Sequence, residues 1–532
     1  MATLADYFAA ELKAAGVERV YGLPGGENVE ILEAIRLCGI DFVLVKNESS
    51  ACFMAATDAR LSGTIGVALT TLGPGAANAA AGLAHAHLDR APVLLITATT
   101  DPELIGRHTH QVLDLSVIFQ PICKLSRELR ACNAAQTIQD ALSLAKAGRP
   151  GPVHLSLHNR IALQKIEPKT EPTAIASAPQ REIDIDAARA LLSDKRNPII
   201  VVGLGLEPGA PYGAIRTIAE RLGAPVIDTP KSKGALTTEH PLFAGTIGLT
   251  REDPVYELLD EADCILAIGF DVVELVKPWD YETPLIWIAN WENRDPRISS
   301  EWEAVGPIDD ILSTLGDISC LSAETWGEER VRQFRDRQSR ICLPTAGAKR
   351  ILPQTFLASL RDNTPDDIIV TTDVGSHKIL AALDWPAREP NRYFVSNGLS
   401  AMGFGLCSAI AAAAATGEPA ICITGDAGLA MVMGELGLLV ERQLPVLVVV
   451  MNDAALDLIR SAQLRADHPA FGVEFHNPDF ELIARAYGIA YRRVESRGDC
   501  DAAIRAGLSR RAPMLIDVMV DPVGYPTTVR KD

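Results

Sequence analysis

Several features that would assign a protein to a class are missing from this sequence. Ten cysteines occur without any Cys-x-x-Cys pair, which argues against a zinc site and a disulfide framework and favours reduced thiols. Lys and Arg number 50 against 68 Asp and Glu, giving a net charge of −18. Proteins that bind nucleic acids or anionic membranes usually carry basic surfaces, so we expect this acidic protein to bind neither. No uncharged run of ~18 or more residues looks like a membrane span; the nearest candidate, GFGLCSAIAAAAATG, is too short and its side chains are too small.

What the sequence does contain is an ordinary globular composition, with 48% hydrophobic and 22% charged residues. At roughly 100–200 residues per domain, the 532 residues suggest about three domains. The first stretch, MATLADYFAAELKAAGVERV, is typical of an amphipathic helix. It has no basic segment followed by an apolar run, which a secretory signal would have, so we expect a cytoplasmic protein.

Short apolar, β-branched runs alternate with helical stretches in three blocks of the chain. This alternation is typical of parallel sheets covered by helices on both faces. The sequence therefore predicts an α/β protein with three doubly wound, mostly parallel-sheet domains. We place them at residues 1–163, 183–320 and 350–532, with a polar, Pro-containing linker, QKIEPKTEPTAIASAPQREID, after the first. Ligands of such sheets bind beyond the carboxyl ends of the strands.

A lone acid, Glu48, follows one of these apolar runs in the stretch LVKNESSACFMAA. An acid at the start of a helix is stabilised by the helix dipole, which would make it structural. The alternative is an acid held in a pocket for proton chemistry. The stretch itself favours the structural interpretation, and only residues elsewhere in the chain can decide between the two.

Two further acids, Asp426 and Asp453, end successive apolar runs in ICITGDAGLAMVMGELGLLVERQLPVLVVVMNDAALDLI. Strand-end Asp and Gly residues are often simple turn formers. However, the ends of adjacent parallel strands lie close together, and two oxygen side chains with a loop carbonyl suit Mg²⁺. Glycines and a helix start beside them suit phosphate groups. The pair therefore predicts a magnesium and phosphate site.

This segment resembles the Gly-Asp-Gly and Asn-Asn pattern of thiamine diphosphate-dependent enzymes. The resemblance implies that Mg²⁺ is held by the side chains of Asp426 and Asp453 and by the carbonyl of Ala455, and that it anchors the cofactor diphosphate. The sequence departs from the pattern twice. Ala427 replaces a glycine, which is tolerable if its backbone angles are not restricted to glycine, and Asp453 replaces an asparagine and adds a negative charge.

The resemblance extends over nearly the whole chain, to the acetolactate synthase, pyruvate oxidase and 2-oxo acid decarboxylase family. YGLPGGENVEILEAI is similar to the first cofactor loop of that family and brings in Gly25. LVKNESSACFMAA implies that Glu48 is the catalytic glutamate, and TLGPGAAN implies that Asn78 lies in the loop closing over the cofactor. THQVLDLSVIFQPICK resembles catabolic, flavin-independent acetolactate synthases and places Gln111 near the reacting centre.

Two later segments, TTDVGSHKI and SNGLSAMGFGL, resemble the segments that bind the cofactor itself. The resemblance implies that Ser376 and His377 approach the diphosphate and that the Gly398 carbonyl meets the aminopyrimidine. It also implies that Met402 supports the bent cofactor. Gly425 and Ala427, which flank Asp426, are also expected to bind the cofactor.

The function implied is decarboxylation of a 2-oxo acid, followed by transfer or release of the resulting acyl-carbanion unit, as in acetolactate synthases. A simple decarboxylase of a larger 2-oxo acid is one alternative, and a non-catalytic cofactor-binding homologue is another. The weak G-x-G of GLGLEPG leaves FAD in the central domain as an option, although we favour an empty domain. The family implies a homodimer or homotetramer with active sites at subunit interfaces. Asn47, where a His is common, and Ala462, where anabolic relatives carry Trp, leave the substrate open.

Overall fold

The computed structural model divides the chain into two compact units, which are described separately. The first comprises Met1–Pro179, Leu399–Gly417 and Val432–Leu438, and the second comprises the rest of the chain. The predicted linker lies mostly outside the described residues. These are residues 2–104, 106–107, 110–166, 183–206, 208, 212–295, 297–316, 318–321, 325–341 and 348–525.

The first unit contains a six-stranded parallel sheet. Its strands run in the spatial order β2 (Asp41–Leu44), β1 (Arg19–Leu23), β3 (Gly66–Thr70), β4 (Val93–Ala98), β6 (Val153–Leu157) and β5 (Leu125–Glu128). Seven helices of the described residues accompany it: α1 (Leu4–Ala14), α2 (Val29–Leu37), α3 (Glu48–Ser62), α4 (Pro74–Leu88), α5 (Leu115–Phe119), α6 (Ala134–Lys146) and α7 (Asn159–Ala162).

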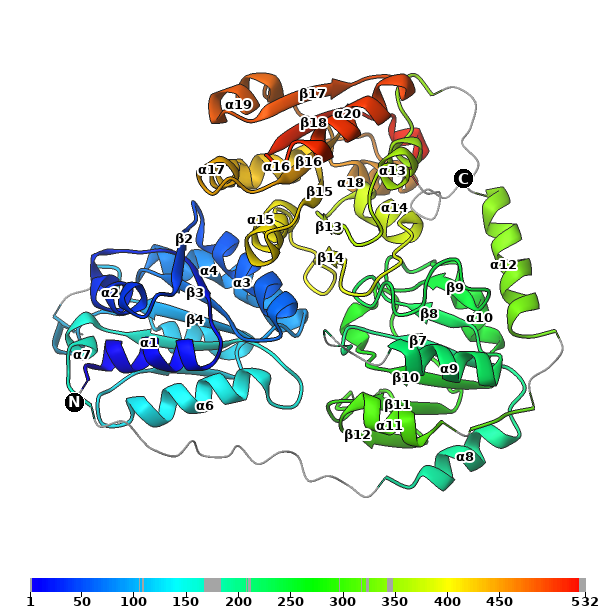
Figure 1. The fold of residues 1–532 in the computed structure, drawn as a ribbon, viewed down its shortest axis with the longest axis horizontal. Coiled ribbons are helices and arrows are strands. Elements are labelled where there is room, and N and C mark those ends of the chain that lie inside the picture. Colours follow the sequence, from blue (N-terminus) through cyan, green and yellow to red (C-terminus); the bar gives the residue numbers. More distant parts are fainter. Residues whose placement is uncertain are drawn as a thin grey trace. The chain divides into compact units, whose positions relative to one another are not determined.

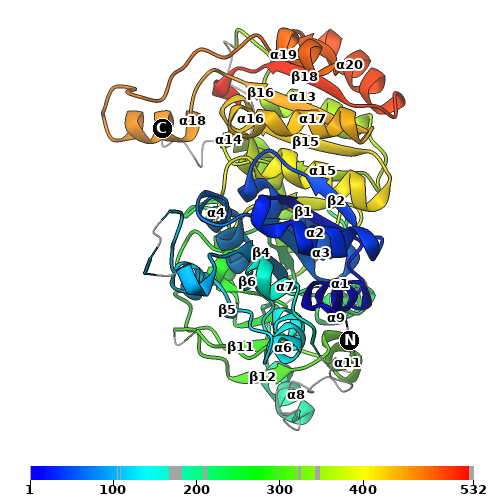
Figure 2. The same cartoon turned by 90° about the vertical axis from the view of Figure 1, so that its left-hand side faces the viewer.

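Helices cover both faces of this first sheet (Figures 1 and 2). One apolar core joins α1, α2 and α6 to alternate residues of the strands, such as Val67 and Leu69 of β3. The helices α3 and α4 pack on each other and against the strands. Every residue of β3, β4 and β6 is buried, because a parallel sheet covered on both faces leaves neither side of a strand to water.

Helix α15 (Phe404–Thr416), from much later in the chain, also belongs to the first unit. It packs against α3, with the Phe53 and Phe404 ring centroids 5.9 Å apart. The Thr57 hydroxyl donates to the Ser408 hydroxyl at 2.9 Å between the same helices. These contacts satisfy polar groups that the close helix packing would otherwise bury unpaired.

The second unit contains two further six-stranded parallel sheets. One follows the order β12 (Trp302–Val305), β11 (Leu285–Ala289), β10 (Cys264–Ile268), β7 (Pro198–Val202), β8 (Val226–Asp228) and β9 (Phe243–Thr246). One face of this sheet packs with α8 (Ile185–Ser193), α9 (Tyr212–Leu222) and α11 (Ile308–Thr314). The other face packs with α10 (Tyr256–Glu261) and α12 (Glu328–Ile341).

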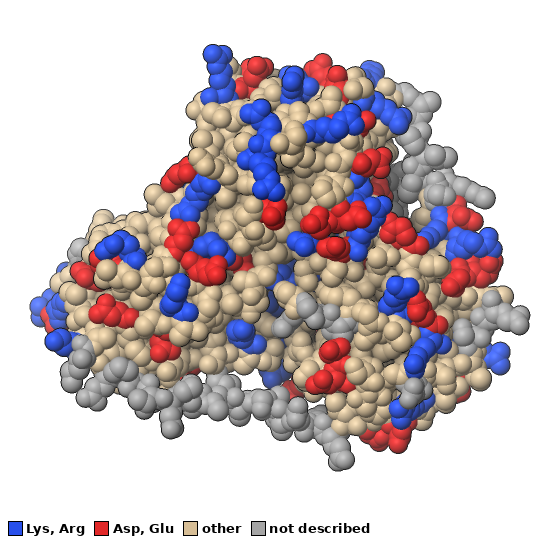
Figure 3. All heavy atoms as spheres, viewed as in Figure 1, with Lys and Arg blue, Asp and Glu red and all other residues tan. Residues whose placement is uncertain are grey.

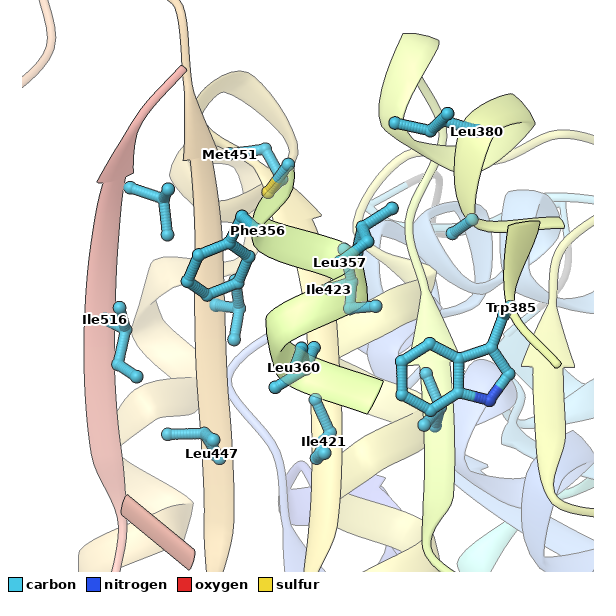
Figure 4. Packing of buried hydrophobic residues seen from close by; sticks show 14 of the residues in the cluster. Phe356, Leu357, Leu360, Leu380, Trp385, Ile421, Ile423, Leu447, Met451 and Ile516 are labelled. Atoms are coloured by element: carbon cyan, nitrogen blue, oxygen red, sulfur yellow. The ribbon is translucent and has the colours of Figure 1, made fainter. Parts of the chain in front are cut away.

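The other sheet of the second unit has strands in the order β14 (Tyr393–Val395), β13 (Ile369–Thr372), β15 (Ala420–Gly425), β16 (Val446–Asn452), β18 (Met514–Met519) and β17 (Ala490–Val494). One face packs with α13 (Pro353–Asp362), α14 (Ser376–Asp384) and α20 (Arg497–Ser509). Figure 4 shows Leu360 of α13 beside Ile421 of β15, in the same apolar cluster as Phe356. The remaining helices are α16 (Asp426–Val432), α17 (Leu436–Glu441), α18 (Asp457–Arg465) and α19 (Phe480–Tyr487).

The first and third sheets have the same strand order, so the predicted α/β class with three doubly wound parallel sheets is confirmed. In each, the chain reverses direction across the sheet between its first and third strands: β1 and β3 in one, β13 and β15 in the other. Such switch points leave a crevice at the carboxyl ends of the strands, where ligands of these folds bind.

The surface mixes charges of both signs. On the face drawn in Figure 3, Lys and Arg are interspersed with Asp and Glu, so the acidic excess is not gathered in one patch there. Among the described residues, no helix has the length and apolar character needed to cross a membrane.

Candidate active site

Asp426 joins three loops at the carboxyl end of the third sheet. It follows β15 and begins α16, and it is almost completely buried. Its Oδ2 accepts a hydrogen bond from the backbone N–H of Ala454 and another from Nδ2 of Asn477, both at 2.7 Å. Asn477 also donates to Oδ1 of Asn452 at 3.0 Å. The loops after β15 and β16 are therefore tied together through one carboxylate.

Asp453 lies in the second of these loops, directly after β16. Its Oδ1 accepts a hydrogen bond from the backbone N–H of Ala455 at 3.2 Å. Burial, and then the charges of Asp426 and Asp457, raise the pKa of Asp453 to about 7. Burial also raises the pKa of Asp426. Carboxylates crowded in this way are stabilised by a cation, and oxygen ligands are those that Mg²⁺ prefers.

Ser376 and His377 begin α14 at the same edge of the sheet. The Ser376 hydroxyl donates to Oδ2 of Asp457 at 2.7 Å. Burial lowers the pKa of His377 to about 4, so its imidazole is neutral at pH 7. Its Nε2 is buried and has no hydrogen-bond partner among the described residues. A Cβ added to Gly425 would stand 3.0 Å from Cε1 of this ring, so glycine allows the close approach.

In the first unit, Glu48 is the first residue of α3 and is buried. Asn47 caps the helix by accepting the backbone N–H of Ser49 at 2.8 Å. The Asn78 side chain donates from Nδ2 to Oε2 of Glu48 at 3.1 Å. A Cβ added to Gly75 would stand 3.2 Å from Oε1 of Glu48. The acid is therefore oriented by the loop and helix that follow β3, as well as by its own helix.

Gly25, after β1, lies against the loop after β3. Its backbone N–H donates to Oδ1 of Asn28 at 2.8 Å, and Asn28 donates to the carbonyl of Thr70 at 2.9 Å. A Cβ at Gly25 would stand 2.3 Å from the Thr71 hydroxyl, closer than any side chain can approach. The two loops therefore converge at the switch point of the first sheet.

Gln111 adopts a left-handed backbone with φ of 59°, which non-glycine residues seldom do. It lies opposite Gly73, since a Cβ added to that glycine would stand 2.8 Å from Cβ of Gln111. Backbone strain of this kind is often found at functional sites. The loop after β3 and the start of α4 thus lie against Glu48, Gly25 and Gln111, three of the residues selected from the sequence.

Two residues selected from the sequence, Gly398 and Met402, lie in other segments than the residues described around Asp426 and around Glu48. Gly398 follows β14, in a loop where the Asn397 side chain donates to the Glu274 carbonyl at 2.8 Å. Met402 is half-buried in the turn before α15, in the first unit.

Comparisons with known proteins match all three parts of the chain. Residues 2–118 match the family model described as thiamine pyrophosphate enzyme, N-terminal TPP binding domain. Residues 185–315 match the central domain of the same family, and residues 373–518 match its C-terminal TPP binding domain. An acetolactate synthase of Bacillus subtilis is 30% identical over 95% of this chain and 91% of its own length.

The chain belongs to the thiamine pyrophosphate enzyme family. Acetolactate synthase isozyme 3 large subunit of Escherichia coli is 30% identical over 97% of the chain and 94% of its own length. A probable acetolactate synthase large subunit of Methanococcus aeolicus is 29% identical over 96% and 91%. The resemblance inferred from the motifs is therefore confirmed.

The residues fit the diphosphate cofactor of a thiamine pyrophosphate enzyme. At the third sheet, Oδ1 of Asn477 and Nε2 of His377 are buried polar atoms without a partner among the described residues. The backbone of Ala427 does not have a left-handed φ angle. This position therefore does not require the glycine that the family pattern has there. No group of three or more His, Cys, Asp or Glu in the described part of the chain is arranged to hold a metal ion.

Sequence motifs missed several residues to which the structure joins the selected ones. Asn477 and Asp457 lie outside the motif but bond to Asp426 and Ser376. Glu435 bonds to the turn before Glu48. Their only signal in the sequence is polarity, which most surface residues share, so no spacing rule could have selected them.

Proposed function

We propose that this chain is a thiamine diphosphate- and Mg²⁺-dependent enzyme of the acetolactate synthase type. It would decarboxylate a 2-oxo acid and transfer or release the acyl unit, acting as a lyase or carboligase. The observation that carries the proposal is the convergence of Asp426 and Asp453 at one sheet edge, in a chain similar to acetolactate synthases over nearly its full length.

When bound, thiamine diphosphate supplies the nucleophilic carbon and the electron sink that decarboxylation requires. The side chains of Asp426 and Asp453 and the carbonyl of Ala455 would hold Mg²⁺. The start of α14, with Ser376 and His377, would face the diphosphate, because backbone N–H groups and the helix dipole favour anions there. Gly425 and Ala427 would let the backbone approach the phosphate oxygens.

Family resemblance supports Glu48 as the acid that would exchange a proton with the pyrimidine ring. The hydrogen bond from Asn78 restrains one oxygen of Glu48, which leaves the other to meet a ring nitrogen. Gln111 would lie near the reacting carbon. Gly25, Gly398 and the Met402 side chain would hold the rest of the cofactor in its bent form, which brings the reacting groups together.

We propose no flavin for the central domain. The crevice between the neighbouring strands β7 and β10 is where such a domain would take a nucleotide. There, Oε2 of the buried Glu274 accepts the backbone N–H of Leu204 at 2.8 Å, so this N–H already has an acceptor within the chain. Burial raises the pKa of Glu274 to about 8.

The assembly we propose is a cytoplasmic homodimer or homotetramer. Glu48 belongs to the first unit and the Asp426 cluster to the second. Family resemblance supports active sites shared between subunits. The three family matches also support domains at residues 1–163, 183–320 and 350–532.

A screen of 2-oxo acids with thiamine diphosphate and Mg²⁺, with products identified by mass, tests the proposal. Acetolactate from pyruvate would support the carboligase, and an aldehyde with CO₂ alone would support a simple decarboxylase. Turnover should be lost in Glu48→Gln. Cofactor binding without turnover of any 2-oxo acid would support the non-catalytic homologue and overturn the proposal.

A further inference from the structure

Glu27 is an acid of the first unit that the proposed function does not use. It lies in the loop after β1, and its Oε2 accepts a hydrogen bond from the Thr71 hydroxyl at 3.0 Å. A Cβ added to Gly25 would stand 2.9 Å from the same oxygen. The carboxylate is therefore held against the backbone of one loop and the side chain of another.

The position of Glu27 is that of a ligand-contacting residue. Strands β1 and β3 are neighbours at the switch point of the first sheet, and Glu27 and Thr71 lie in the loops that follow them. In doubly wound sheets the ligand crevice opens between such loops. A carboxylate in these loops is within reach of a ligand that binds in that crevice.

Thr71 also connects Glu27 to the catalytic acid. Its hydroxyl contacts Glu27, and its methyl group lies 2.7 Å from where a Cβ of Gly75 would stand. Oε1 of Glu48 lies 3.2 Å from that same point. Glu27 and Glu48 therefore approach the same short loop, which the resemblance places over the cofactor.

The charge of Glu27 is not neutralised nearby. Within the described part of the chain, no Lys or Arg side chain forms an ion pair with it. An ionised carboxylate only accepts hydrogen bonds, and it repels a second carboxylate. A 2-oxo acid already brings one carboxylate, so the substrate group that meets Glu27 has to be another part of the molecule.

We propose that Glu27 is a specificity-determining residue that faces the substrate side chain. It accepts a hydrogen bond from a hydroxyl or amino group there and disfavours a side chain with a second carboxylate. The inference rests on the proposed function, because it concerns the same site and the same 2-oxo acid.

The test compares kcat/KM for pyruvate, 3-hydroxypyruvate and 2-oxoglutarate in the wild type and Glu27→Gln. We expect Glu27→Gln to raise the ratio of 2-oxoglutarate to pyruvate by about tenfold, since a like-charge contact is removed. The ratio of 3-hydroxypyruvate to pyruvate should fall, because an amide accepts a hydrogen bond more weakly than a carboxylate. Glu27→Asp keeps the charge and should keep rejecting 2-oxoglutarate.

Glu30→Gln, in the first turn of α2, is the matched control, because it removes the same charge from the neighbouring turn. Its ratios should equal those of the wild type. Thiamine diphosphate affinity, measured by calorimetry, should be unchanged in Glu27→Gln, whereas a merely structural role would weaken it.

Two failures are distinguishable. If the wild type turns over pyruvate but the ratios in Glu27→Gln move by less than about twofold, this inference is overturned and the proposed function stands. If neither the wild type nor any variant turns over a 2-oxo acid, although the cofactor binds, both this inference and the proposed function are overturned.

Discussion

The carboxylate of Glu435 accepts the backbone N–H of Lys46 with both oxygens, at 3.0 and 3.1 Å. Lys46 lies two residues before Glu48, in the turn between β2 and α3. Glu435 is almost completely buried, and burial raises its pKa. A residue far away in the sequence therefore holds the turn that presents the proposed proton-transferring acid.

Replacing Glu435 should weaken catalysis through position rather than through lost chemistry. Glu435→Ala removes the carboxylate that accepts the Lys46 N–H in a partly buried hydrogen bond, which costs about 1–3 kcal/mol of stability. A shift of the turn that carries Glu48 should lower kcat on the order of a hundredfold. Glu435→Gln keeps one acceptor oxygen and should recover much of kcat. Equal losses in the two variants, measured by steady-state kinetics, would contradict the positioning role.

Asn477 offers a test of the proposed metal site from outside its ligands. Asn477→Leu removes the hydrogen bonds to Asp426 and Asn452 while roughly conserving volume. Because such supporting contacts orient metal ligands, we expect Mg²⁺-dependent cofactor affinity to fall by about 10- to 100-fold in calorimetry. The neighbouring, exposed His476→Ala is the control and should bind normally. Chelation of Mg²⁺ should abolish binding in all three proteins, and binding that survives chelation would contradict the metal site.

Gly75 should tolerate no side chain. A Cβ there would stand 2.7 Å from Cγ2 of Thr71 and 3.2 Å from Oε1 of Glu48. Gly75→Ala should therefore cost about 1–3 kcal/mol of stability through overpacking, measured by thermal denaturation. Gly213→Ala, in α9, meets nothing within 4 Å and should leave stability the same or slightly higher. Similar behaviour of the two variants would show that the loop after β3 is loosely packed.

The buried His154 should make the protein less stable in mild acid. Its ring bonds to Thr97 at 2.9 Å and Ser126 at 2.8 Å, and burial lowers its pKa to about 3. Between its ordinary value of 6.5 and this value, only the unfolded chain takes up the proton, so the contribution to stability is lost as pH falls through that window.

From pH 6.5 to 5 this contribution falls by about 2 kcal/mol. Urea denaturation of the wild type and His154→Gln at pH 7 and pH 5 measures it, because other groups titrate alike in both proteins. We expect the variant to lose less stability on acidification. The same pH dependence in both would mean that the ring takes up a proton in the folded state.

Much of the architecture followed from local patterns. Buried strands such as β15 and β16 are continuous apolar runs, since parallel strands covered on both faces expose no side to water. Strand ends are marked by Gly and Asp, so Asp426 and Asp453 could be selected, and the parallel arrangement required their proximity. Glu48 could be selected only through family resemblance, because an acid that begins a helix has an ordinary structural explanation.

What the sequence by itself determined is therefore the order of strands and helices, the sheet class and the strand-end acids, since each depends on neighbours along the chain. The tertiary structure alone decided the contacts of Glu435 with Lys46, of Asn477 with Asp426 and of Glu27 with Thr71. Each joins loops far apart in the sequence, and a polar side chain carries no mark of its distant partner until packing excludes water and leaves one geometry that satisfies both.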